Sequence, residues 1–195
     1  MKIAADVESP GPNVCVFPTE SELSKLAEIF TSHGLTAISI GCGQGFLEGL
    51  LQNAGVNVYA VDLEPSIKPQ KTLSEQYCYC DIHRIPSWAL FDFPRPKSSA
   101  LLICFGRRIP LTAYLEAFPD CHMCILIGDN GGITDPAADA LKGSAEWKVL
   151  QETTMRGVMK PIFCVIYQKN NSNFRREVHK SPLVAQDDML CIDDI

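Results

Sequence analysis

Three glycines and one carboxylate are the residues of this sequence best suited to hold a ligand. Gly41, Gly43 and Gly45 directly follow the apolar run 37–40. Glycine lets the backbone turn sharply and leaves room for a ligand against the main chain. Asp62 ends the next apolar run, 19 positions after Gly43, where a carboxylate can accept both hydroxyls of a ribose. The pattern predicts a site for an adenosine-type ligand.

The elements that must position these residues follow from short apolar runs that alternate with helical patterns. A first helix is predicted from Thr19, which forms a capping box with Glu22. The predicted strands are 37–40, 56–61, 77–80, 100–105, 121–127, 147–155 and 161–167, and the other predicted helices are 45–53, 111–118 and 136–141. Only residues 156–160 separate the last two strands, so these strands must be antiparallel. The chain is therefore a series of βαβ units that ends in a hairpin.

Polar and proline-rich ends divide the chain into three parts. Residues 1–13 are predicted to be a flexible lead-in, residues 14–169 a single domain, and residues 170–195 a flexible tail. The tail ends in acidic pairs around a short apolar stretch, a pattern that suits docking into a partner's groove. The alternative is that it is only a solubilising end.

Composition narrows the function classes. The 195 residues are 46% apolar and 21% charged, with a net charge of −6, which is typical of a soluble globular protein. The chain lacks the basic field that a nucleic-acid backbone requires, which disfavours nucleic acid as a partner. It also has no apolar stretch long enough for a bilayer. Nine cysteines without an export signal predict reduced thiols in the cytoplasm or nucleus.

A family resemblance sharpens the ligand assignment. The dinucleotide fingerprint would require a third glycine at position 46, where this chain has Phe46. With glycines at 41, 43 and 45, the segment 39–45 resembles the first motif of the class I S-adenosylmethionine-dependent methyltransferases. Asp62 matches that family's ribose-binding acid. Asp81-Ile82, with Pro86 beyond, is similar to its segment after the third strand. The resemblance covers about residues 17 to 168.

The resemblance implies an α/β fold, a Rossmann-like three-layer sandwich. Its mostly parallel seven-stranded sheet has the strand order 3-2-1-4-5-7-6 and a C-terminal antiparallel hairpin. It implies S-adenosylmethionine as cofactor, with Asp81 accepting a hydrogen bond from the adenine amino group and Ile82 packing on the ring. The implied cofactor-binding residues are Ser39, Gly41, Gly43, Gly45, Asp62, Leu63, Asp81, Ile82, Cys104 and Phe105.

The same strand order bears on the two close cysteine pairs, Cys78/Cys80 and Cys121/Cys124. It separates strands three and five by about 19 Å, four strand spacings. The two pairs then cannot share a zinc ion, and no metal site is predicted.

The sequence departs from the family at two places. Ser39 stands where the family usually has an acid directed towards the methionine moiety. After the fourth strand, the segment 105–108 reads Phe-Gly-Arg-Arg where a related subgroup carries Trp-Pro-Pro. The candidates at the acceptor side are Arg107 and Arg108, which could clamp an acidic acceptor, and Asp129, which could orient it. The alternative for each of these three is an ordinary loop residue that faces solvent. Glu48 is interpreted as an exposed charge on the predicted helix 45–53.

Two functions of different classes fit these residues. The first is methyl transfer from S-adenosylmethionine to a small molecule or a protein side chain, a reaction that requires mainly alignment from the protein. The second is a catalytically inactive methyltransferase-like adaptor or ligand-responsive binding module, which Ser39 and the segment 105–108 favour. A nicotinamide-dependent oxidoreductase is a third, weaker alternative.

Overall fold

The computed structural model describes residues 14–64, 78–88, 96–106, 108–129, 141–157 and 160–170. The helices in these ranges are α1 (Glu20–Ser32), α2 (Phe46–Asn53) and α3 (Leu111–Ala117). The strands are β1 (Thr36–Ile40), β2 (Val58–Leu63), β3 (Ile82–Ile85), β4 (Ser99–Cys104), β5 (Cys121–Gly128), β6 (Trp147–Met155) and β7 (Ile162–Lys169). The predicted lead-in, the tail beyond Asn170 and the predicted helix 136–141, except for Leu141, lie outside the described residues.

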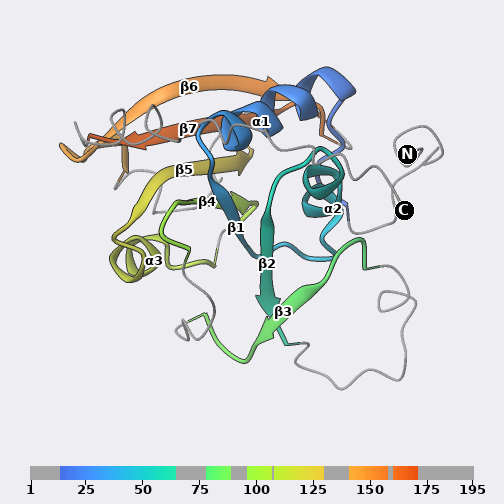
Figure 1. Ribbon diagram of the computed structural model, residues 1–195, viewed down its shortest axis with the longest axis horizontal. Coiled ribbons are helices and arrows are strands. Elements are labelled where there is room, and N and C mark those ends of the chain that lie inside the picture. Colours follow the sequence, from blue (N-terminus) through green and yellow to red (C-terminus); the bar gives the residue numbers. More distant parts are fainter. Residues whose placement is uncertain are drawn as a thin grey trace, which may run out of the picture.

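All seven strands join one sheet in the order β3-β2-β1-β4-β5-β7-β6 (Figure 1). The strands from β3 to β5 pair in parallel, and β7 runs antiparallel to both β5 and β6. This confirms the predicted α/β fold class, the strand order and the C-terminal hairpin. The order reverses between β1 and β4, which makes their carboxyl ends the switch point where open α/β sheets bind ligands.

Helices cover both faces of the sheet, which gives the predicted three layers. Successive strand residues point to opposite faces, and both faces of the central strands are buried. Leu102 of β4 packs in a cluster with α1 and α2, whereas Leu101 packs in a second cluster with α3. Because both faces are apolar, the central strands are continuous hydrophobic runs, as parallel strands usually are.

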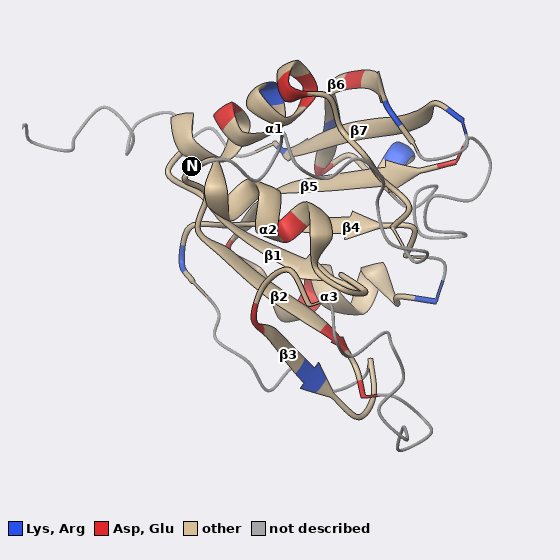
Figure 2. Cartoon of the chain, turned by 90° about the vertical axis from the view of Figure 1, so that its right-hand side faces the viewer, with Lys and Arg blue, Asp and Glu red and all other residues tan. Residues whose placement is uncertain are grey.

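Charged side chains are absent from the central strands β1, β4 and β5 and lie on the helices and outer strands (Figure 2). Two of them, Asp62 of β2 and Arg84 of β3, occupy paired positions in the sheet. None of the helices within the described ranges combines the length and apolar character needed to cross a membrane.

The capping box predicted for the first helix is confirmed. The Glu22 carboxylate accepts a hydrogen bond from the Thr19 amide at 2.7 Å, and the Thr19 hydroxyl accepts one from the Glu22 amide at 3.3 Å. Glu22 also accepts a hydrogen bond from the amide of Arg156, which follows β6. The cap thus fixes both the start of α1 and its position against the hairpin.

The prediction of the third strand at 77–80 is wrong, because β3 is Ile82–Ile85. Tyr79 packs on α2 instead of pairing in the sheet. Its ring lies edge-on to that of Phe46, with centroids 4.9 Å apart, and its amide donates to the Gln44 carbonyl at 3.0 Å. The real strand is at the sheet edge and carries exposed His83 and Arg84. Its sequence therefore lacks the apolar run of a central strand.

Candidate ligand-binding site

The glycine turn joins β1 to α2 at the carboxyl edge of the sheet. Gly41, Gly43 and Gly45 have φ angles of +78°, +62° and +75°, in the left-handed region that glycine adopts readily. The amides of Gly41 and Cys42 both donate to the carbonyl of Val61, at 2.8 and 3.3 Å. The turn is therefore tied to the end of β2, next to the predicted ribose-binding acid.

Gly45 has no room for a side chain, whereas Gly43 is open, and this difference indicates their roles. A Cβ on Gly45, the N-cap residue of α2, would overlap the Cys80 sulfur. A Cβ on Gly43 would meet nothing within 4 Å, and Gly43 is exposed. Gly45 therefore lets the chain before β3 pack closely on the turn. Gly43 leaves open backbone where a ligand can approach.

Asp62 faces the turn from β2. Its carboxylate accepts hydrogen bonds from the Gly43 amide at 2.5 Å and from the Leu63 amide at 2.6 Å. The Arg84 guanidinium lies 4.0 Å away. Burial raises the pKa of Asp62, and the two amides and Arg84 partly oppose this shift. A carboxylate has about four acceptor positions, so two amides leave capacity for the hydroxyls of a ligand.

Ser39 and Glu48 form a buried polar pair under the turn. Ser39 of β1 faces the α2 side of the sheet, and its hydroxyl donates to the Glu48 carboxylate at 2.5 Å. Glu48 is only 2% exposed, so its interpretation as exposed helix charge is wrong. Burial is the main reason that the pKa of Glu48 is raised to about 7. The Ser39 hydrogen bond and the residue's own amide oppose this shift, and the Asp62 charge adds to it.

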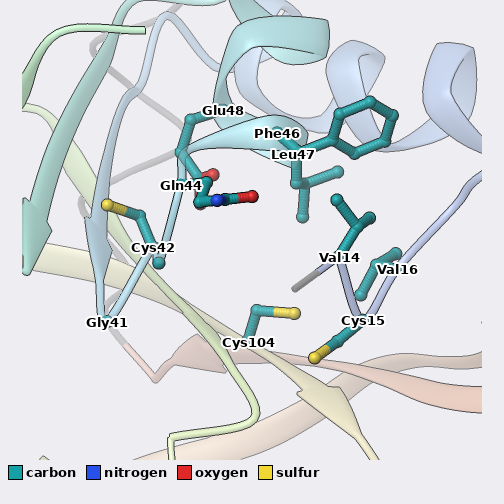
Figure 3. Close-up of a pocket in the computed structure, with 11 residues that line it drawn as sticks. Val14, Cys15, Val16, Gly41, Cys42, Gln44, Phe46, Leu47, Glu48 and Cys104 are labelled. Carbon is teal, nitrogen blue, oxygen red and sulfur yellow. The ribbon is translucent and has the colours of Figure 1, made fainter. Parts of the chain in front are cut away.

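A cavity of about 90 Å³ lies between the turn, the start of α2, the end of β4 and the segment before α1 (Figure 3). Its lining residues are Val14, Cys15, Val16, Gly41, Cys42, Gly43, Gln44, Phe46, Leu47, Glu48 and Cys104. Burial raises the pKa of the Cys42 and Cys104 thiols, so both are neutral at physiological pH. Small-molecule pockets usually have about 300–1,000 Å³. The cavity therefore fits one end of a ligand that continues across Gly43.

The described acceptor-side candidates, Arg108 and Asp129, do not line this cavity. Phe105 has a φ of +55°, rare for a bulky residue, and its amide donates to Ile127. Arg108 is exposed, and Asp129 lies 3.5 Å from Lys160. Arg107 falls outside the described residues. Of the two described residues predicted to bind the cofactor at the end of β4, Cys104 lines the cavity and Phe105 does not.

The adenine contacts of Asp81 and Ile82 stay a prediction, although the two residues stand differently relative to β3 than expected. Both were expected to follow the third strand, whereas Asp81 precedes β3 and Ile82 begins it. Asp81 lies three residues before Arg84, the partner of Asp62, which is about 10 Å along a strand. The Ile82 side chain packs under Gly45. Leu63, by contrast, ends β2 and packs partly buried on the α3 side.

Sequence reasoning missed Glu48, Gln44 and the wall formed by the segment 14–16. One signal for Glu48 was available. Ser39 is a polar residue in an otherwise apolar strand that is buried on both faces, and a buried hydroxyl requires a partner. In an eight-residue helix, Glu48 is the only acid that can reach it.

Solved structures identify the fold. One similar chain, an uncharacterised protein from Listeria monocytogenes serotype 4b, has a TM-score of 0.52 at 17% identity, over 79% of this chain and 69% of its own. Magnesium protoporphyrin IX methyltransferase from Synechocystis PCC 6803 has a TM-score of 0.50 at 16% identity, over 77% and 79%. The methyltransferase domain of bacterial CtHen1-C has a TM-score of 0.52 at 15% identity, over 76% and 97%.

The fold is that of the class I S-adenosylmethionine-dependent methyltransferases. No protein-family model matches the sequence, and no curated protein matches it either. At identities of 15–17%, the likeness extends to this methyltransferase-like fold and not to a substrate. Among the described residues, no three His, Cys, Asp or Glu side chains are arranged to hold a metal ion.

Proposed function

We propose that this protein binds S-adenosylmethionine and transfers its methyl group to a small molecule or a protein side chain. The observation that carries the proposal is the open glycine turn whose Gly43 amide lies against the Asp62 carboxylate. The turn stands at the switch point of the sheet. The Synechocystis methyltransferase, which shares the fold, was solved with S-adenosylmethionine bound.

Each part of the site has a role in this proposal. Asp62 accepts hydrogen bonds from the ribose hydroxyls, and Gly41 and Gly43 let the ligand lie against the main chain. Leu63, Cys104 and Phe105 supply apolar contacts. Bound S-adenosylmethionine supplies a methyl group whose bond to sulfur breaks as the bond to the acceptor forms, leaving a neutral thioether. Since the leaving group is neutral, no general acid is required, and the protein contributes mainly alignment.

We assign recognition of the acceptor to the loop after β4 and the end of β5. Arg107 and Arg108 could bind an anionic acceptor through bidentate hydrogen bonds, and Asp129 could orient it. The exposure of Arg108 keeps its guanidinium accessible to such a molecule.

Binding of the cofactor is tested by calorimetry with S-adenosylmethionine and S-adenosylhomocysteine. We expect Asp62→Ala to weaken both by about ten- to hundred-fold, because each hydrogen bond to a charged group contributes about 1.5–3 kcal/mol. Glu116→Ala, at an exposed acid on α3, is the matched control and should leave the affinity unchanged. Absence of binding by the wild-type protein at millimolar ligand would refute the proposal.

A binding module or adaptor without turnover is the second candidate function. Two departures favour it, namely Ser39 and the segment Phe105-Gly106-Arg107-Arg108. A ligand-bound structure separates the two candidates. A methyl group that faces an open channel beside Arg108 and Asp129 supports the enzyme. A methyl group enclosed by Phe105 or Arg107 supports the binding module.

A further inference from the structure

The Glu48 carboxyl is a buried acidic group on the wall of a cavity. It is 2% exposed, and it lines the cavity together with Gln44 (Figure 3). Its hydrogen-bond donors are the Ser39 hydroxyl and its own backbone amide. Both donors are neutral. A buried carboxylate is costly unless a cation pairs with it, and no described cation hydrogen-bonds to Glu48, so the site is suited to a cation that arrives with a ligand.

The groups around Glu48 reinforce this preference. Those that interact with it electrostatically are Asp62 at the end of β2, Cys42 in the turn, Cys80 before β3 and Cys104 at the end of β4. These groups are either negative or neutral. The described base that reaches this region is Arg84, which pairs with Asp62 and also opposes the rise that burial causes in the pKa of the Cys42 and Cys80 thiols. It is not among the groups that shift the pKa of Glu48, so a positive group beside Glu48 would be attracted by the Glu48 and Asp62 carboxylates.

We propose that Glu48, presented from α2 and held by Ser39, binds the ammonium group at the amino-acid end of S-adenosylmethionine or S-adenosylhomocysteine. The proposal rests on the proposed function, because it assumes that the adenosine part lies on Gly43 and Asp62. It accounts for the position and the size of the cavity, which adjoins the turn and fits only one end of such a ligand.

Proton release is a direct consequence of this arrangement. With a pKa of about 7, Glu48 in the free protein is about nine-tenths protonated at pH 6. An ammonium group beside it favours the carboxylate. Binding of the amino-acid end should then release close to one proton to the buffer at pH 6. A ligand that lacks this end should release none.

The experiment compares S-adenosylhomocysteine with 5′-methylthioadenosine, which keeps the adenosine and the thioether but lacks the amino acid. Titration calorimetry of the full chain at pH 6, in two buffers of different ionisation enthalpy, measures the protons released. We expect about 0.9 proton for S-adenosylhomocysteine and none for methylthioadenosine. At pH 8, Glu48→Gln should weaken S-adenosylhomocysteine by about ten- to hundred-fold. The same substitution should change the affinity for methylthioadenosine less than twofold. At pH 6, it should abolish the proton release that accompanies binding of S-adenosylhomocysteine.

The controls separate this inference from the proposed function. Glu116→Gln removes an exposed acid on α3 and should change neither the affinity for either ligand nor the proton release. If both ligands bind wild type but no proton is released, or if Glu48→Gln weakens both equally, Glu48 does not bind the ammonium group and cofactor binding stands. If neither ligand binds wild type, the proposed function itself is wrong, and this inference with it. The wild-type comparison decides the question even if the variant does not fold.

Discussion

Replacing Glu48 by Gln should stabilise this protein at neutral and alkaline pH, although it alters a buried, hydrogen-bonded residue. Glutamine has nearly the same shape, and its amide oxygen can still accept the Ser39 hydrogen bond, which spans 2.5 Å in the wild type. What the substitution removes is the charge. Without a ligand, that charge is buried, and its hydrogen-bond donors among the described residues are neutral.

The magnitude follows from the pKa of Glu48, which is 4.5 for an ordinary glutamate and about 7 in the folded protein. The folded state therefore keeps a proton that the unfolded state releases, so the free energy of unfolding falls as the pH rises from 4.5 through 7. The full difference corresponds to about 3 kcal/mol. Below pH 4.5 both states are protonated at this residue, and the penalty is absent.

Urea denaturation of wild type and Glu48→Gln, at intervals from pH 4.5 to 8, measures this effect without a ligand. The two free energies of unfolding should nearly coincide at pH 4.5 and diverge to about 3 kcal/mol in favour of Glu48→Gln at pH 8. The raised pKa of Asp62 contributes to both profiles, so the difference between the curves isolates Glu48. The profile of Glu116→Gln should stay parallel to that of wild type.

Two outcomes would refute this reasoning. Parallel profiles for wild type and Glu48→Gln would mean that Glu48 titrates normally and is hydrated in solution. A variant that is less stable than wild type across the whole range would mean that the Ser39 hydrogen bond contributes more than the buried charge costs.

Two further predictions concern the elements that position the site. Gly45→Ala should lower the free energy of unfolding by about 1–2 kcal/mol or more, because Gly45 has a φ of +75° and a Cβ there would overlap Cys80. An unchanged urea midpoint would contradict it. Thr19→Ala should cost about 1 kcal/mol through loss of the α1 cap. Thermal denaturation with Ser21→Ala as the control measures this loss, and equal melting temperatures would show that the cap contributes nothing.

Much of the fold could be predicted from the sequence, because local signals and long-range packing agree in the central strands. The runs at β1, β4 and β5 are apolar at nearly every buried position on both faces, with Ser39 and Ser99 as polar exceptions, which is what a parallel strand between two helical layers requires. The short connection between β6 and β7 left only an antiparallel pairing. The glycine turn and Asp62 could be paired in the same way, since both stand at carboxyl ends of adjacent strands.

Local patterns misplaced β3 and Glu48, because both depend on contacts between elements; for Glu48 the signal was the polar Ser39 in a buried strand, not the pattern of α2 itself. The predicted strand 77–80 has strong strand propensity, but the Tyr79 side chain packs on Phe46 of α2. The true strand includes two exposed polar residues, so tertiary pairing overrides local preference. For Glu48, a charged residue in a short helix is usually exposed. Its burial follows from α2 lying directly over Ser39.

Ser39, which departs from the family pattern, and the buried Glu48 are best understood as one feature. Ser39 faces the α2 side of β1, and its hydroxyl donates to the Glu48 carboxylate. That carboxylate therefore lies where an acidic side chain at position 39 would reach. Class I methyltransferases usually carry an acid at this strand position. This chain provides one from the neighbouring helix, beside a cavity that also adjoins the turn. The serine therefore does not argue for loss of the ligand site, because the negative charge is retained within one hydrogen bond of its usual place. The case for a protein without turnover rests instead on the segment after β4.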